Sequence, residues 1–173
     1  TINLDHLFKP KSVAVIGASN RPHSVGQVMM RNLLAGGFKG PIMPVNPHSQ
    51  SIGGVLAYPD VNSLPVTPEL AVICVPPKAV VPTMECLADK GCLAAIVLTA
   101  GLGAEPFDET RSIKQAMLDI AASCKMRLLG PNCLGLMVPG IGLNASFSHQ
   151  SIENGKIAFV SQSGALCTAV LDW

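Results

Sequence analysis

The stretch Ser12–Gly26, SVAVIGASNRPHSVG, decides the fold of this 173-residue chain. Its first part, Val13–Ile16, is wholly apolar and rich in β-branched residues, which is typical of a strand buried on both faces of a parallel sheet. Gly17 then opens a loop of small and polar residues, and from Val25 the apolar residues recur at helical spacing. Strand, glycine loop and helix form the first unit of a nucleotide-binding α/β fold. Because backbone N–H groups at the start of such a helix point into the loop, a phosphate group is the expected ligand.

The loop departs from the dinucleotide fingerprint G-x-G-x-x-G. That motif needs glycine at the positions of Ser19 and Pro22, and the gap from Gly17 to Gly26 is too wide. NAD-binding proteins also place an acidic residue after the second strand, where this chain has Asn46. The sequence therefore predicts a phosphorylated ligand and disfavours NAD. A glycine that only closes a tight turn remains the alternative.

Composition narrows the class of protein further. A length of 173 residues suits one domain, and a net charge of +1 with 13% charged residues gives no basic surface for nucleic acid. Glycine, proline or charge interrupts every apolar run short of a membrane span, and we expect no signal peptide. The six cysteines form no C-x-x-C pair, so we expect a reducing cytoplasm, without disulfides or a metal site.

Apolar runs alternate with helical patterns along the first 130 residues. This alternation predicts a Rossmann-like doubly wound parallel sheet with right-handed crossovers. The expected strands are 13–16, 42–45, 71–75, 95–98 and 126–129, and the expected helices are 4–8, 24–36, 78–90 and 108–123. Residues 50–68 read as a polar connection rich in glycine and proline. Ligands bind beyond the carboxyl ends of the strands in such sheets, and the unusual residues of this sequence follow those ends.

After Pro139 the pattern restarts. Residues 157–160 are expected to form a strand, 161–164 a second loop of small residues, and 165–173 the start of a helix. We therefore expect a domain over 1–140, and over 141–173 the connection and first strand–helix unit of a truncated second α/β domain. A C-terminal helix that simply finishes here is the alternative.

Several motifs, taken together and in order, resemble the CoA-binding domain of ADP-forming acyl-CoA synthetases, including the α subunit of succinyl-CoA synthetase. They are Phe8–Ser19 (FKPKSVAVIGAS), Pro44–Pro47 (PVNP), Val75–Pro77 (VPP), Gly130–Gly135 (GPNCLG) and Ser161–Gly164 (SQSG). Two further stretches, Met29–Phe38 and Gly142–Ser148, are closer still to bacterial protein lysine acetyltransferases. Those proteins fuse a synthetase-like region to a GNAT acetyltransferase domain.

The resemblance implies a site for coenzyme A or acetyl-CoA. The glycine loop would hold the phosphates, through Gly17, Ala18, Ser19, Asn20 and Arg21, with Ser24 and Gly26 opening the helix. The turns at Asn46, Pro47, Val75, Pro76 and Pro77 would contact the adenosine end. Thr99, Ala100 and Gly101 would lie by the pantetheine arm, and Asn132 and Cys133 near the thiol.

Two departures from the family pattern concern charge. His48 stands where a lysine usually meets a CoA phosphate, and Ala100 stands where succinyl-CoA synthetase often has glutamate. The cation for the 3′-phosphate is therefore expected to be Arg21, with His48 or Lys78 as further candidates. Cys133 has no histidine base near it in sequence, so we interpret it as a small residue near the thiol and not as a nucleophile.

The leading hypothesis is a CoA-binding fragment of a synthetase-like lysine acetyltransferase, with no catalytic residue of its own. The alternatives are the CoA-binding domain of an active ADP-forming acetyl-CoA synthetase, an NAD(P)-binding dehydrogenase domain, and a free-standing regulatory protein. The expected partners are CoA or acyl-CoA and the remaining domains of a parent chain, with a homo-oligomer left open. As a test, Ala18→Glu is expected to weaken CoA binding on the order of a thousandfold, and to leave the fold intact if the loop lies at the surface.

Overall fold

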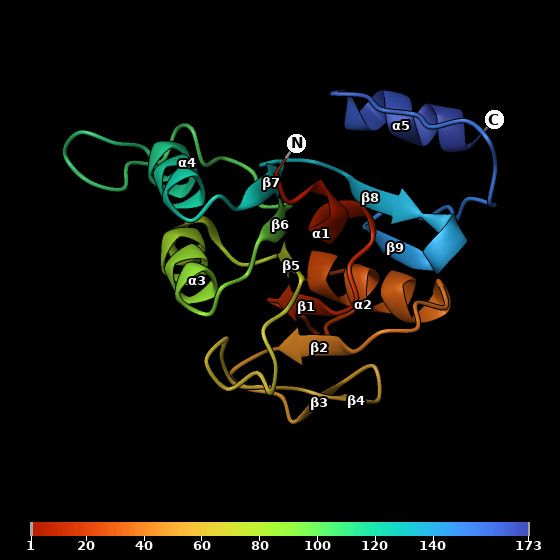
Figure 1. The fold of residues 1–173 in the computed structure, drawn as a ribbon, viewed down its shortest axis with the longest axis horizontal. Helices are drawn as coiled ribbons and strands as arrows, with labels where there is room; N and C mark the ends of the chain where they lie inside the picture. The colour runs from red at the N-terminus through yellow and green to blue at the C-terminus, as the bar shows by residue number, and fades with distance from the viewer. Residues whose placement is uncertain (1, 173) are drawn as a thin grey trace.

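The computed structural model describes residues 2–172 and has a five-stranded parallel sheet at its centre (Figure 1). The strands lie in the order β2-β1-β5-β6-β7. They are β1 (Val13–Ile16), β2 (Ile42–Val45), β5 (Leu70–Ile73), β6 (Ala94–Val97) and β7 (Arg127–Leu129). This arrangement confirms the predicted Rossmann-like, doubly wound sheet.

Helices cover both faces of the sheet, which is why its three inner strands, β1, β5 and β6, are wholly apolar and buried. On one face lie α1 (Leu4–Phe8) and α2 (Val25–Ala35), where Val13 and Val15 pack in one core cluster with Met29. On the other face α3 (Pro77–Asp89) packs beside α4 (Ile113–Ser123), and Ala14 and Ile16 belong to the core there. Alternate residues of β1 therefore serve two separate cores.

Two antiparallel hairpins form separate two-stranded sheets beside the central one, and sequence patterning predicted neither. The first joins β3 (Ser51–Ile52) to β4 (Val55–Leu56) within the expected polar connection. The second joins β8 (Gly135–Val138) to β9 (Leu143–Ser146) through a 3-10 turn, η1 (Pro139–Ile141). These strands lie outside the alternation of strands and helices that marks the central sheet, and they are too short to show a period-2 pattern of their own.

The second hairpin is fastened to α2 by a buried amide. Asn32 of α2 donates from Nδ2 to the backbone oxygens of Ser146, at 2.9 Å, and Ser148, at 2.8 Å. Leu143 and Ala145 of β9 are buried in the same core as α2. The chain just after β9 is thus held against the outer side of α2.

The predicted helix over 108–123 is wrong at its start, because α4 begins only at Ile113. Asp108 accepts hydrogen bonds at Oδ1 from the backbone N–H groups of Thr110, at 2.9 Å, and Arg111, at 2.8 Å. A carboxylate that bonds to its own following backbone stabilises a turn in place of a helix. Ser112 caps the helix instead, by accepting from Gln115 N.

The predicted strand over 157–160 is also wrong. These residues are coil, and Ile157 is 93% exposed. The following helix α5 (Gly164–Leu171) forms as predicted, but none of its residues is buried, and in Figure 1 it lies apart from the sheet. A strand needs a neighbour to accept its hydrogen bonds, and no described strand pairs with 157–160. We call residues 150–172 the C-terminal arm.

Candidate functional site

The carboxyl ends of β1 and β5 form the centre of the site. The chain leaves β1 towards β2 on one side, whereas β5 and the strands after it run to the other side. Ligands of doubly wound sheets bind at this point of reversal, because the loops diverge there and leave a crevice. The two ends are joined by the backbone, since Cys74 N donates to Ile16 O at 2.8 Å.

Two glycines make the loop after β1 possible. Gly17 has a φ of +88°, and a Cβ there would lie 2.8 Å from the backbone oxygen of Cys74. At Gly26, in the first turn of α2, a Cβ would lie only 2.1 Å from the backbone oxygen of Gly17. The helix therefore starts almost in contact with the end of the strand, and any side chain at Gly26 would push the two apart.

The loop offers hydrogen-bond donors that the protein does not use. Among residues 2–172, no acceptor lies in hydrogen-bonding position for the backbone N–H groups of Ser19 and Asn20. Ser24 caps α2 by accepting from Gln27 N at 3.3 Å, so the positive end of the helix dipole faces the same loop. Free N–H groups beside a helix N-terminus suit an anionic oxygen, above all a phosphate.

Two asparagine side chains hold this loop in shape. Asn46, after β2, donates from Nδ2 to Ala18 O at 2.8 Å and accepts at Oδ1 from His48 N. Asn20 donates to Ser51 O and accepts from Gly53 N, which ties the loop to the β3–β4 hairpin. Both amides are thus engaged within the protein, where sequence reasoning assigned them to the ligand.

Hydrogen bonds also join the chain just after β5, β6 and β7. Thr99 donates from Oγ1 to Val75 O at 2.7 Å, and Asn132 N donates to Thr99 O at 3.1 Å. Pro76 occupies the N-cap position of α3 without a side-chain capping bond, and Pro77 is the first residue of the helix. The structure thus brings the predicted residues of the last three strand ends next to one another.

Cys133 lies half buried beside this junction. Its Sγ donates to Val97 O at 3.5 Å, and burial raises the pKa of the Cys133 thiol. Burial likewise raises the pKa of the Cys74 thiol to about 12. Protonated thiols are poor nucleophiles, which agrees with our interpretation of Cys133 as a small residue near the site.

The candidate cations lie on the surface. Arg21 and His48 are both exposed, as is Lys78 on α3, and no described carboxylate pairs with any of them. Ala18, in contrast, is completely buried and belongs to the α2 core. The surface position on which an intact fold in Ala18→Glu depended is therefore not found, and that substitution would bury a carboxylate.

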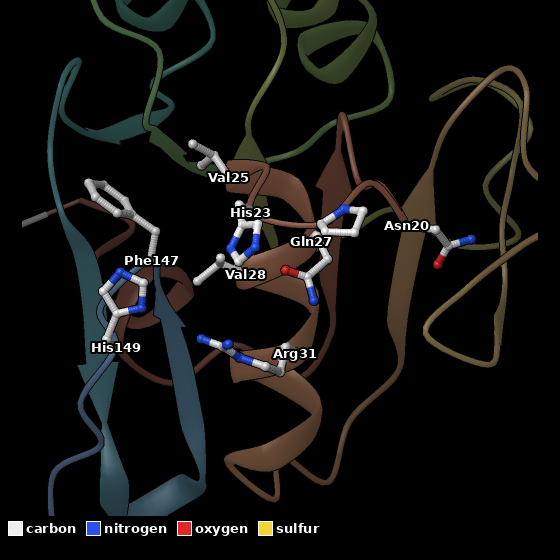
Figure 2. Close-up of a pocket in the computed structure, with 9 residues that line it drawn as sticks. Asn20, His23, Val25, Gln27, Val28, Arg31, Phe147 and His149 are labelled. Atoms are coloured by element: carbon white, nitrogen blue, oxygen red, sulfur yellow. The ribbon is translucent and has the colours of Figure 1, made fainter.

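Sequence reasoning missed one group of residues beside the loop. A hollow of about 550 Å³ lies between α2 and the chain after β9, and Arg31 and His149 are among its lining residues (Figure 2). These two residues lie far apart in sequence, and no motif links them. Only the pairing of β9 with β8 and its packing on α2 brings them together.

None of the helices described in residues 2–172 is long and apolar enough to cross a membrane. The same residues contain no group of three or more His, Cys, Asp or Glu side chains arranged to hold a metal ion.

The fold and the glycine loop define a doubly wound α/β domain with a phosphate-type loop at its point of strand reversal. A family model described as "CoA binding domain" matches residues 11–139. The chain belongs to this family.

Similar proteins of known sequence point the same way. The chain is 41% identical over 170 residues to acetate–CoA ligase [ADP-forming] I of Archaeoglobus fulgidus, covering 98% of this chain and 24% of that protein. It is 38% identical to the α subunit of acetate–CoA ligase [ADP-forming] II of Pyrococcus furiosus, covering 97% of this chain and 36% of that subunit. The chain therefore spans well under half the length of these relatives.

A solved structure extends the likeness to three dimensions. The dinucleotide-forming acetyl-coenzyme A synthetase 1 of Ca. Korarchaeum cryptofilum, in complex with phosphate and ADP, superimposes with a TM-score of 0.90 at 37% identity. The superposition covers 99% of this chain and 36% of that one. These relatives are ADP-forming ligases and a synthetase, which favours our synthetase alternative over the lysine acetyltransferase hypothesis.

Proposed function

We propose that this chain binds coenzyme A or an acyl-CoA such as acetyl-CoA, as the CoA-binding part of an ADP-forming acyl-CoA synthetase. The observation that carries the proposal is the loop between β1 and α2, where Gly17 and Gly26 allow the helix to meet the strand and leave N–H groups free. Membership of the CoA binding domain family supports it, as do the ADP-forming ligases among the relatives.

In this proposal the loop residues Gly17–Arg21 receive the pyrophosphate, through backbone N–H groups and the dipole of α2. The adenosine end lies against the turns after β2 and β5, and the pantetheine arm runs past Thr99 towards Asn132 and Cys133. Asn20 and Asn46 act as positioning residues, because their amides hold the loop. The chain contributes binding and orientation, and no residue of the site is assigned a covalent step.

We further propose that the C-terminal arm belongs to a second α/β unit of a parent protein. The unit expected from the sequence began at residue 141, but Leu143 and Ala145 of β9 pack in the core with α2, so the unit proposed here begins after β9. Val160 is 92% exposed in the arm, and α5 carries exposed Leu166 and Val170. Apolar side chains on this scale are normally covered by another part of a protein. The greater length of the relatives is consistent with such a partner. The lysine acetyltransferase hypothesis is supported only by the two sequence stretches that suggested it, Met29–Phe38 and Gly142–Ser148.

The test is a calorimetric titration of the chain with CoA, acetyl-CoA and NADH. We expect CoA and acetyl-CoA to bind, and NADH to bind more weakly or not at all. NADH binding more tightly than CoA would contradict the proposal.

A charge placed in the loop sharpens this test. Ser19 is partly exposed, so Ser19→Glu replaces the unsuitable Ala18→Glu. Like charges about 4 Å apart at an effective dielectric constant of about 20 repel by roughly 4 kcal/mol, on the order of a thousandfold in affinity. Ser151→Glu, on the exposed arm, is the matched control and should bind CoA like the wild type. Unchanged CoA affinity in Ser19→Glu, with an unchanged melting temperature, would place the ligand outside this loop.

A further inference from the structure

The hollow beside the glycine loop has the size of a small-ligand pocket. Its volume of about 550 Å³ lies within the range of known ligand sites. Its lining comes from three segments: the loop after β1 with His23, helix α2 with Gln27 and Arg31, and the chain after β9 with Phe147 and His149. Figure 2 shows Arg31 extending from α2 towards His149, with His23 at the end of the hollow nearest the loop.

The hollow is lined by basic side chains and by no acidic ones. Its lining includes an arginine and two histidines and no carboxylate. Within residues 2–172, no Asp or Glu oxygen lies within 4.0 Å of Arg31, His23 or His149. The guanidinium donates only long hydrogen bonds to the adjacent Asn32 Oδ1, at 3.4 Å from Nε and 3.3 Å from Nη2. Its positive charge is therefore not compensated by any described side chain.

The same asparagine fixes the geometry of the hollow. Asn32 is buried, and its Nδ2 binds the backbone of Ser146 and Ser148, on either side of Phe147 and next to His149. One side chain thus sets the position of α2, which carries Arg31, against the segment that carries His149. The site is held in place by the fold and does not depend on the exposed arm.

We propose that this hollow binds a phosphate group, with Arg31 as the principal contact and His149 and His23 as further donors. A guanidinium presents a fork of N–H donors that matches two oxygens of a phosphate, and the imidazoles of His23 and His149 add N–H donors to the same lining. Two sources offer the same chemistry: free inorganic phosphate, or the 3′-phosphate of CoA, for which Arg31 would then take the place of Arg21, the cation expected from the sequence. Only the second source rests on the function proposed above.

The first experiment titrates the 173-residue chain with inorganic phosphate at low ionic strength. We expect one phosphate per chain, with affinity about tenfold or more weaker in Arg31→Gln and a smaller loss in His149→Gln. Lys114→Gln, which removes an exposed charge from α4 on the opposite face of the sheet, is the matched control and should bind phosphate unchanged. Equal melting temperatures would show that all variants are folded. Absence of phosphate binding by the wild type, or equal binding by wild type and Arg31→Gln, would overturn the proposal.

The second experiment identifies the source by comparing CoA with 3′-dephospho-CoA. If the 3′-phosphate occupies the hollow, Arg31→Gln weakens CoA about tenfold and leaves dephospho-CoA unchanged. If free phosphate occupies it, Arg31→Gln weakens phosphate alone. The Ser19→Glu measurement distinguishes a failure of this proposal from a failure of the proposed CoA site. If Ser19→Glu weakens CoA binding but Arg31→Gln changes no phosphate binding, this inference is wrong and the CoA proposal is unaffected.

Discussion

Two segments of this chain share one sequence plan and fold differently. Val13–Gly26 and Ile157–Gly164 each have an apolar run followed by a loop of small residues and a helix start. In both, a serine caps the helix: Ser24 Oγ accepts from Gln27 N at 3.3 Å, and Ser163 Oγ accepts from Leu166 N at 3.2 Å. Yet Val13 is fully buried in a strand, whereas Ile157 is 93% exposed in coil.

The difference lies in the neighbours. β1 pairs with β2 on one side and β5 on the other, and α2 is covered by the sheet and by β9. The second run has no described strand beside it, and α5 buries none of its residues. A helix cap needs only a few adjacent residues and forms in both places, but a strand needs a partner. Local chemistry therefore sets the helix starts, and tertiary pairing decides which apolar run becomes a strand.

Among the single-atom-group changes, the largest effect is expected at the first of the two helix-start glycines, Gly26 and Gly164. Gly26→Ala should destabilise the chain by about 3 kcal/mol or more, because its Cβ would lie 2.1 Å from Gly17 O. At Gly164 the nearest atom to a Cβ, in Leu134, is 4.0 Å away, so Gly164→Ala should change stability by less than about 0.5 kcal/mol. Urea denaturation of both variants measures this contrast. A similar loss of stability in both variants would mean that the segment Ile157–Gly164 is packed like Val13–Gly26.

The strands of the central sheet could be predicted from sequence because each is a short apolar run between glycine or proline signals, as in Val13–Ile16. The same rule failed at 157–160, where the run is equally apolar but unpaired. It also missed β8 and β9, whose pairing depends on a turn at Pro139–Ile141 and on the amide of Asn32. Contacts between distant residues leave no periodic pattern in the sequence.

Part of the candidate site could be predicted from the sequence, and part could not. Gly17 and the strand ends could be placed from sequence, because parallel strands bring their carboxyl ends to one edge. The structural role of Asn46 could not, since its contact with Ala18 O joins two separate loops. The pocket residues Arg31 and His149 were missed for the same reason. The burial of Ala18 was missed because a small residue after a glycine reads equally well as loop or core.

A smaller effect is expected from the hydrogen bonds that fix the two loops. Asn46→Ala should cost about 1–2 kcal/mol and weaken CoA binding, because Ala18 O loses its partner and the loop is no longer held from β2. In the second loop, Ser163 N donates to Ser161 Oγ, a contact within the exposed arm. Ser161→Ala should therefore leave both the melting temperature and CoA affinity unchanged. Thermal melting with calorimetry measures both properties, and a silent Asn46→Ala would show that the first loop keeps its shape by itself.

The paired caps give a still smaller difference. Ser24→Ala should lower the free energy of unfolding by about 1 kcal/mol. Helix α2 is part of the core, and the substitution removes a capping bond that exists in the folded state and not in the unfolded state. Ser163→Ala removes an equivalent bond, but α5 buries nothing, so unfolding of the domain should not change. Amide hydrogen exchange at Leu166 should nevertheless speed up, since its N–H loses the serine oxygen. A drop in domain stability with Ser163→Ala would show that α5 is coupled to the sheet.

The smallest expected effect is the most direct test of the comparison. Ile157→Asp should change the free energy of unfolding by no more than about 0.5 kcal/mol, because the side chain is already in water. Val13→Asp, at the matching start of the first run, should prevent folding, because an unpaired carboxylate would lie in a fully buried position between two strands. Circular dichroism and urea denaturation of the two variants give the contrast directly. If Ile157→Asp cost more than about 1 kcal/mol, the second run would be packed in solution. The difference between the two units would then reflect what covers each of them, and the partner of the second would have to be sought within this chain or in a second copy of it.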